Sequence, residues 1–154
     1  MKENIIQLIT AFLGSAGFAL VFNIRNSLVF MVSVGGFFSW GLFLIFQSIT
    51  ANYFVASFAA SAFAALYGEV MARVNKTPAS VFFIPGVVSL IPGGDLFYTM
   101  SYALKSDWDS FRHYSSLTVQ YALGIACGIS MAWALWYMLQ KFITSHKPSE
   151  NFNV

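Results

Sequence analysis

The sequence predicts an all-α integral membrane protein, built as a bundle of about five transmembrane helices. Two features of its composition favour this fold class: 58% of the 154 residues are hydrophobic, and only 9% are charged. A soluble domain carries about 25% charged residues, and a small fold exposes too much of its chain to stay dispersed in water without them. The third feature is a series of apolar runs, each close to the roughly 20 residues that a helix needs to cross a bilayer.

Five such runs follow one another, at residues 5–22, 28–46, 53–72, 79–104 and 117–139. The first is long for a signal peptide, and its Lys2 is offset by Glu3, so we expect it to be kept as a span. The polar segment 105–113 is expected to be a water-exposed loop. The chain is therefore divided into a five-span transmembrane domain, residues 1–140, and a polar, flexible C-terminal tail, residues 141–154.

The distribution of Lys and Arg predicts the orientation of these spans. With five crossings, one side of the membrane carries Lys2, Lys105 and Arg112. The opposite side carries Arg25, Arg73, Lys76, Lys141 and Lys147. This bias predicts a multi-pass protein of the cell (inner or plasma) membrane, with its N-terminus outside and its C-terminus in the cytoplasm.

Small residues recur at four-residue steps and predict where helices pack together. In lipid, helices associate through close packing of small side chains rather than through the hydrophobic effect. The third run carries Ala56, Ala60, Ala64 and Gly68 at such steps, and the last run carries Gly124 and Gly128. We expect these residues to form helix–helix contacts, and they give no indication of a substrate.

The strongest local signal lies in the fourth run, which we expect to be broken at Pro85 and Pro92. Proline removes a backbone donor and clashes with the preceding turn, and Gly93 and Gly94 weaken the helix further. Non-helical backbone at membrane depth is tolerated only where it is buried in protein or lines a water-filled cavity. Transporters use such breaks to bind substrates and ions. The alternative is an ordinary turn in which Asp95 is a solvated helix cap.

Two acidic residues are candidates for proton coupling, Glu69 and Asp95. An ionisable group inside a span is costly and usually faces a cavity or a partner, so the functional hypothesis places both carboxyl groups at one polar cavity. The alternative for Glu69 is an ion pair with Arg73, which follows it by four residues near the end of the third run.

Several kinds of chemistry have no support in the sequence. It contains no phosphate-binding glycine loop, nucleophile elbow or paired metal-ligand motif, so we expect no enzyme activity, no cofactor and no metal site. The small net charge of +2 and the lack of a basic stripe argue against a nucleic-acid partner. Cys127, the only cysteine, excludes an internal disulfide and is expected to be a packing residue.

The five-span layout and the segment from Phe83 to Met100 resemble the threonine/serine exporter family. The sharpest part of the match is Pro92 and Gly93 followed by the aromatic Phe97. The similarity is to the C-terminal membrane half of the family, in particular to the small stand-alone subunit of the split exporters associated with succinate. It implies a substrate-binding segment formed by Pro92, Gly93, Gly94, Asp95 and Phe97.

The resemblance also implies a function and a partner. The function is secondary, proton-driven export of a small carboxylate-bearing metabolite such as threonine, serine or succinate. The partner is a second five-span subunit, or a second copy of the chain, because two five-span halves would form an inverted repeat around one site.

One departure from the family pattern bears on the substrate. Gly94 and Asp95 stand where the family often has an apolar and a small neutral residue, and an ionised Asp95 would repel a dicarboxylate but suit an ammonium group. The competing hypothesis is a structural or assembly subunit of the membrane that has no substrate of its own.

Overall fold

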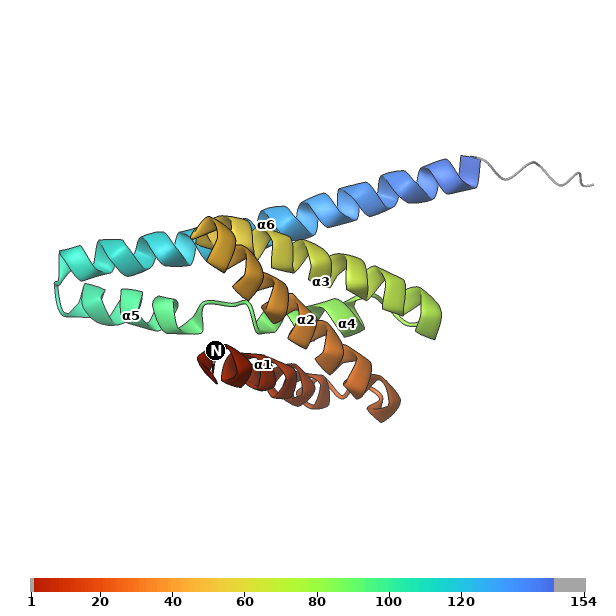
Figure 1. Cartoon of the computed structure of the whole chain (residues 1–154), viewed down its shortest axis with the longest axis horizontal. Helices are drawn as coiled ribbons and strands as arrows, with labels where there is room; N and C mark the ends of the chain where they lie inside the picture. The colour runs from red at the N-terminus through yellow and green to blue at the C-terminus, as the bar shows by residue number, and fades with distance from the viewer. Residues whose placement is uncertain (1, 146–154) are drawn as a thin grey trace, which may run out of the picture.

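The computed structural model describes residues 2–145, and these residues form six helices and no strand. The helices are α1 (Lys2–Val21), α2 (Asn26–Thr50), α3 (Tyr53–Asn75), α4 (Ser80–Val88), α5 (Gly93–Leu104) and α6 (Trp108–Ser145). Four of them, α1, α2, α3 and α6, are long and apolar enough to cross a bilayer, and the number of spans is five if the bent pair α4 and α5 forms one broken span. The predicted fold class is therefore confirmed, and the chain is a multi-pass membrane protein (Figure 1).

Short connections make neighbouring long helices run antiparallel. Between α2 and α3, Ala51 adopts a left-handed conformation, and Asn52 then caps α3 by accepting a hydrogen bond from the backbone N–H of Phe54 at 2.9 Å. Within the resulting bundle, α2 contacts α1, α3 and α4, while α3 contacts α6 as well. The core of this bundle thus lies around α2 and α3.

The glycines of α6 allow it to approach α3 closely. A Cβ atom on Gly124 would lie 2.6 Å from the carbonyl oxygen of Phe54 and 2.9 Å from the Cβ of Ser57, and one on Gly128 would collide with Ser61. The Ser61 hydroxyl reaches back to the carbonyl oxygen of Gly124 at 3.5 Å. The two glycines spaced four residues apart on α6 therefore pack against the two serines spaced four residues apart on α3.

The alanines spaced four residues apart on α3 form a face next to that of the serines. Ala56 and Ala60 are fully buried and pack with Phe43 of α2 and with Leu90, which follows α4. Ala64 is also buried, and Gly68 lies against α4, where a Cβ atom would be 2.8 Å from the Cβ of Phe83. Two adjacent faces of α3 are therefore built from small residues, and each accommodates a different neighbour.

The expected loop at residues 105–113 is largely helical, which corrects the prediction. Asp107 caps α6, because its Oδ1 accepts a hydrogen bond from the backbone N–H of Ser110 at 3.3 Å. Hydrogen bonds from Ser110, first through its side chain and then through its backbone, hold the pKa of Asp107 below its usual value. The polar residues after this cap therefore form the first turns of α6, since a strong N-cap outweighs their low hydrophobicity.

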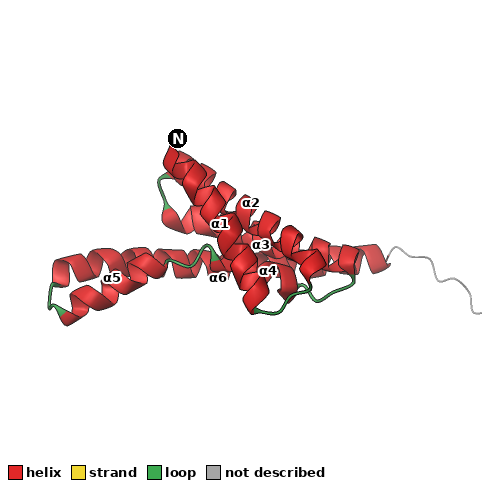
Figure 2. Cartoon of the chain, turned by 90° about the horizontal axis from the view of Figure 1, so that it is seen from below, coloured by secondary structure: helices red, strands yellow, loops and turns green. Residues whose placement is uncertain are grey.

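As a result, α6 has 38 residues and is about 57 Å long at 1.5 Å per residue, nearly twice the thickness of a bilayer core. Its second half packs along α3, and its first half pairs with α5, which contacts no other helix. We call α5 together with residues 108–120 the arm. The arm extends beyond the ends of α2 and α3 (Figures 1 and 2).

The prediction of a helix break at Pro85 is wrong, whereas the break before Gly93 is observed. Pro85 lies inside α4 and is fully buried, together with Phe82. Packing against α1, α2 and α3 holds this short helix, so the loss of one backbone donor is tolerated.

The C-terminal end of α6 lies beyond the predicted end of the transmembrane domain. The helix continues to Ser145, five residues into the expected tail, and residues 146–154 lie outside the described part of the chain.

The contact between α3 and α6 can be tested with a pair of glycine substitutions. Gly128→Ala should lower the free energy of unfolding by roughly 1–3 kcal/mol, because the added methyl group overpacks the contact with Ser61. Gly17→Ala is the control, since no atom lies within 4 Å of the added Cβ and alanine favours a helix by up to about 1 kcal/mol. Thermal unfolding in detergent measures both, and equal stability of the two variants would contradict the contact.

Candidate functional site

The fourth span breaks between Val88, where α4 ends, and Gly93, where α5 begins, and the two helices are bent by 52°. Pro92 has no N–H group to continue the ladder of α4, and its ψ angle of 66° lies outside the helical region. Tight turns replace the ladder, with the N–H of Leu90 donating to Val87 and that of Gly93 donating to Ile91, both at 2.8 Å. The sequence thus forces an irregular backbone at the point where resemblance to the exporters is sharpest.

A buried serine on α1 hydrogen-bonds the segment that leads into this break. The Ser15 hydroxyl donates to the carbonyl oxygen of Pro85 at 3.1 Å, and its side chain is 1% exposed. Ser15 fits there because Gly36 on α2 has no side chain, since a Cβ on Gly36 would lie 2.7 Å from that of Ser15. Three helices therefore meet through one hydrogen bond and one glycine.

Beyond the break, the backbone of α5 is accessible and carries a carboxylate. No atom lies within 4 Å of a Cβ placed on Gly93 or Gly94. Asp95 follows in the first turn of α5, where a negative charge is favoured by the helix dipole, and it is half-buried. Its carboxyl group interacts electrostatically with Tyr121 of α6. Four of the predicted substrate-binding residues, Pro92, Gly93, Gly94 and Asp95, thus lie together at the break.

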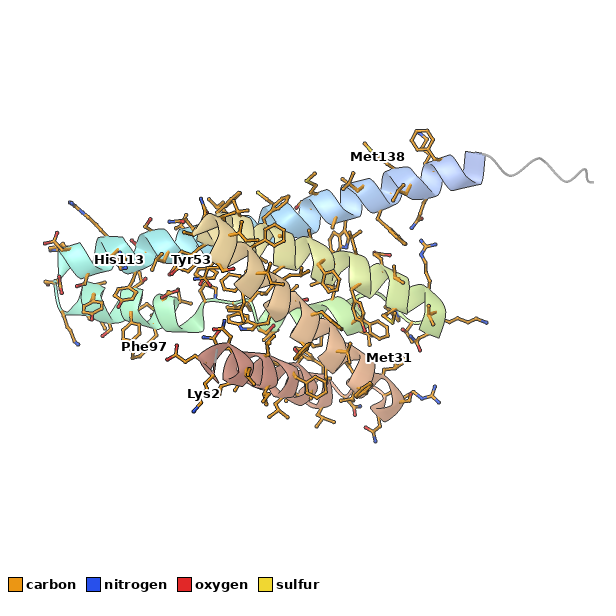
Figure 3. The ribbon with its side chains drawn as sticks, viewed as in Figure 1. Lys2, Met31, Tyr53, Phe97, His113 and Met138 are labelled. Carbon is orange, nitrogen blue, oxygen red and sulfur yellow. The ribbon has the colours of Figure 1, made fainter. Side chains whose placement is uncertain are left out.

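The fifth residue, Phe97, does not join them. Its side chain is 66% exposed and lies on the outer side of α5 (Figure 3). Its ring contacts Tyr98 edge-on, with 5.6 Å between the ring centroids. The structure therefore places this aromatic where it can contact lipid or another protein rather than the space at the break.

Glu69 also lies away from Asp95. Asp95 is level with Tyr121, which contacts Tyr53 at the start of α3 with 5.2 Å between ring centroids. Glu69 is 16 residues further along α3, which corresponds to about 24 Å. The structure does not bring the two proton-coupling candidates to one cavity, because Asp95 lies near the start of α3 and Glu69 lies towards its end.

Arg73, the alternative partner of Glu69, contacts α6 instead. Its guanidinium lies over the ring of Trp136, 4.8 Å from the centroid. With the Gln140 amide oriented to suit its neighbours, the Gln140 oxygen accepts from this guanidinium and from Trp136 Nε1, the latter at 2.6 Å. These contacts fasten the C-terminal end of α3 to α6. Glu69 is half-buried and forms no ion pair within the described part of the chain.

A cavity of about 220 Å³ adjoins the break on the side of α1 and α2. It is lined by Gln7, Thr10, Ala11, Gly14, Phe18, Trp40, Val88 and Ser89. Four of these residues carry polar atoms, and the sequence analysis did not single them out as site residues. Gln7 and Thr10 could be found only as polar breaks in an apolar run, and Trp40 and Ser89 gave no signal because their position depends on how three helices pack.

A stack of aromatic rings connects this cavity with Asp95. Trp40 stacks on Phe43 with 4.9 Å between centroids, and Phe43 stacks on Tyr121 with 5.6 Å. Tyr121 is the residue that interacts with Asp95. Three packed rings therefore run from the cavity to Tyr121, the residue on which the Asp95 charge acts.

This arrangement combines a discontinuous span, an accessible backbone and a carboxylate within a bundle of apolar helices, and it defines a protein of the membrane transporter class. Among the described residues, no three His, Cys, Asp or Glu side chains are grouped so that they could hold a metal ion.

The family can then be named. Residues 7–135 match the model of the family described as threonine/serine exporter, ThrE, and the chain belongs to this family. The family consists of membrane exporters, so the resemblance to the threonine/serine exporter family is confirmed, while the similarity to the stand-alone subunit of the split exporters stays a prediction. No curated protein and no solved structure matches the chain.

The geometry of the site can be checked by disulfide formation in a background where Cys127 is replaced by alanine. The Thr99 and Thr118 hydroxyl oxygens are 3.4 Å apart, so the pair Thr99→Cys and Thr118→Cys should cross-link on oxidation. The pair Glu69→Cys and Asp95→Cys should not. Mobility on a non-reducing gel distinguishes the two pairs, and efficient cross-linking of the second would overturn the separation described above.

Proposed function

We propose that this chain is one membrane half of a secondary exporter that moves a small carboxylate-bearing metabolite, threonine or serine in the first place, out of the cell. The observation that carries the proposal is the broken fourth span of an exporter-family protein, with Pro92, Gly93, Gly94 and Asp95 gathered at the break. The accessible backbone of Gly93 and Gly94 supports it, because the positive end of a half-helix dipole attracts a carboxylate.

The charge at the break favours an amino acid over succinate. An ionised Asp95 repels a dicarboxylate, whereas the ammonium group of threonine or serine pairs with it. Succinate, the substrate suggested by the split exporters, becomes compatible with this site only if Asp95 is protonated. Comparing efflux of the two substrate types therefore tests the charge state as well as the substrate.

Proton coupling is proposed to act through Asp95. This carboxyl group is half-buried at the break, and its charge acts electrostatically on Tyr121, which belongs to the aromatic stack beside the cavity. Glu69, the second candidate, has to act separately, since it lies about 24 Å further along α3.

A second five-span half is proposed to complete the exporter, either a different subunit of the same family or a second copy. The arm supports this proposal, because α5 buries no residue of its own and contacts only α6. Met100 and Leu104 on the arm are 62% and 88% exposed. A hairpin of two helices cannot bury both apolar faces by itself, so the arm offers an uncovered surface for the other half.

The orientation is proposed to be N-terminus outside and C-terminus in the cytoplasm of a cell membrane. Four basic residues of the described chain lie towards the α6 C-terminal end of the bundle, Arg25, Arg73, Lys76 and Lys141. Three lie towards the opposite end, Lys2, Lys105 and Arg112. Fluorescence of a cytoplasm-dependent reporter fused after the C-terminus should be retained, and its loss in an inserted, full-length fusion would reverse the orientation.

The function is tested by measuring efflux of threonine, serine and succinate from cells carrying this chain alone, a candidate five-span partner alone, both, or neither. We expect efflux of threonine or serine that depends on this chain. The double variant Pro92→Ala, Gly93→Ala should abolish it, because a continuous helix replaces the break. Gly17→Ala, on an open face of α1, is the control and should export normally.

Membrane insertion of each variant is checked by immunoblotting of washed membranes. Full efflux by the inserted double variant would show that the break has no part in transport. If none of the three metabolites moves in any combination, the exporter proposal fails, and the hypothesis of a structural membrane subunit takes its place.

A further inference from the structure

The stripe of α3 that faces α6 ends in two ionisable residues. Ser61 packs against Gly128 of α6, and Arg73 contacts Trp136, so α3 and α6 run parallel. The two facing stripes follow the same four-residue step, at residues 61, 65, 69 and 73 of α3 and at residues 128, 132, 136 and 140 of α6. Because both helices rise equally per residue, Glu69 lies level with Trp136, one turn before Arg73.

Arg73 directs its charge to α6 rather than to Glu69. Its guanidinium lies 4.8 Å from the centroid of the Trp136 ring, and the Gln140 oxygen accepts a hydrogen bond from it. We call Arg73, Trp136 and Gln140 the clasp. Glu69 precedes Arg73 by four residues, a spacing at which the two side chains can pair, but it forms no ion pair among residues 2–145. The same guanidinium can therefore adopt two arrangements, and the structure shows the one that holds α6.

Few other contacts hold this end of α6. Ala132 is 1% exposed and is the last buried residue of α6 up to residue 142, whereas Leu135 and Phe142 are 46% and 76% exposed. Trp133 adds an edge-on contact with Phe83 of α4, with 5.5 Å between the ring centroids. The C-terminal end of α6 points away from the end of α3 (Figure 1). Opening of the clasp would therefore free the last turns of α6 without disrupting the packed core of the bundle.

The charge of Glu69 decides which arrangement is favoured. An ionised carboxylate inside a span is costly unless it is paired, so an ionised Glu69 attracts Arg73 along α3 and away from α6. A neutral Glu69 offers no ion pair, and the guanidinium keeps its contacts with Trp136 and Gln140. Because such coupling is reciprocal, a proton on Glu69 favours the closed clasp, and loss of that proton favours the open one.

The other ionisable groups around Glu69 are few. Helices α2 and α4, which pack on α3, contain no ionisable residue. At this end of α6 the ionisable residues are Tyr137 and Lys141, and both are exposed. On α3 the Tyr67 hydroxyl donates to the backbone of α2 at 2.7 Å, and Lys76 forms the C-cap of the helix. Lys141 is therefore a suitable control cation, because it lies on the opposite helix at the same end of the bundle.

We propose that Glu69 and Arg73 form a proton-operated switch for the contact between α3 and α6. Arg73 holds α6 in the clasp while Glu69 is protonated, and it pairs with Glu69 and releases α6 when the proton leaves. The inference rests on the proposed export function and deepens it, since this end of the bundle is the one proposed to face the cytoplasm. Loss of the Glu69 proton to the cytoplasm then opens the side from which an exporter takes up its substrate.

The switch is tested by measuring the distance between the ends of α3 and α6 as a function of pH. Spin labels are attached at Val74→Cys and Met138→Cys, both exposed positions, in the Cys127→Ala background. The full chain is placed in lipid nanodiscs without any transported metabolite. The ratio of the longer to the shorter distance should rise about fivefold from pH 4 to pH 8, which is the upper end of what a partly exposed ion pair contributes.

Matched variants assign the change to this pair of residues. Glu69→Gln should keep the shorter distance at every pH, whereas Arg73→Gln should give the longer distance at every pH, because the clasp is lost. Asp95→Asn and Lys141→Gln should respond to pH like the labelled parent protein. A parent distance that does not depend on pH, a response that persists in Glu69→Gln, or a shorter distance that persists in Arg73→Gln would each overturn the switch.

Efflux measurements separate the switch from the function on which it rests. If the labelled protein responds to pH as described and no metabolite is exported with any partner, the exporter function fails although the switch stands. If the wild type exports, Glu69→Gln should lower the rate about fivefold, in line with the lost shift in the distance ratio, and Lys141→Gln should not. Export at the wild-type rate by Glu69→Gln would overturn the link between the clasp and substrate uptake.

Discussion

The structure depends on one constraint, which is that backbone polar groups at membrane depth must be satisfied inside the protein. Pro92 interrupts the fourth span and ends its hydrogen-bond ladder, so the segment that leads into the break has to be enclosed. The enclosure starts at Ser15, whose hydroxyl bonds the Pro85 carbonyl oxygen, and it is possible only because Gly36 leaves room for that serine. A short α4, too short to span a bilayer and containing a proline, persists because α1, α2 and α3 all pack against it.

The need to enclose the broken span also explains where small residues lie on α3. The alanines of α3 are buried against α2 and the segment after α4, and its serines accept the close approach of Gly124 and Gly128. Both small-residue faces of α3 are thereby packed, so α3 is the central helix against which the broken span and α6 are held. The contacts of Arg73 with Trp136 and Gln140 fasten the far end of the same pair. At the other end of the pair, Tyr121 contacts Tyr53 and stacks on Phe43, and this is the end at which the break lies.

Sequence reasoning predicted the parts of the fold that depend on local composition. Long apolar runs gave the spans, and the Pro92–Gly94 cluster gave the break, because each effect acts over a few neighbouring residues. Reasoning from sequence failed where tertiary packing or a single cap decides the structure. Pro85 was expected to break a helix that packing maintains, and the polar residues after Asp107 were expected to form a loop that this cap converts to helix. The cavity was out of reach for the same reason, since Thr10, Trp40 and Ser89 meet only when three helices cross.

The separation of Glu69 from Asp95 narrows what the protein can do. Two carboxyl groups at one cavity would allow a proton to pass between them, whereas Glu69 lies about 24 Å along α3 from Tyr53, beside which Tyr121 and Asp95 are found, so the two carboxyl groups cannot share a proton directly. Between Asp95 and the cavity, the structure offers the electrostatic influence of Asp95 on Tyr121 and the ring contacts of Tyr121 with Phe43 and of Phe43 with Trp40. Phenylalanine carries no exchangeable proton, so this row of rings cannot pass one between Asp95 and the cavity.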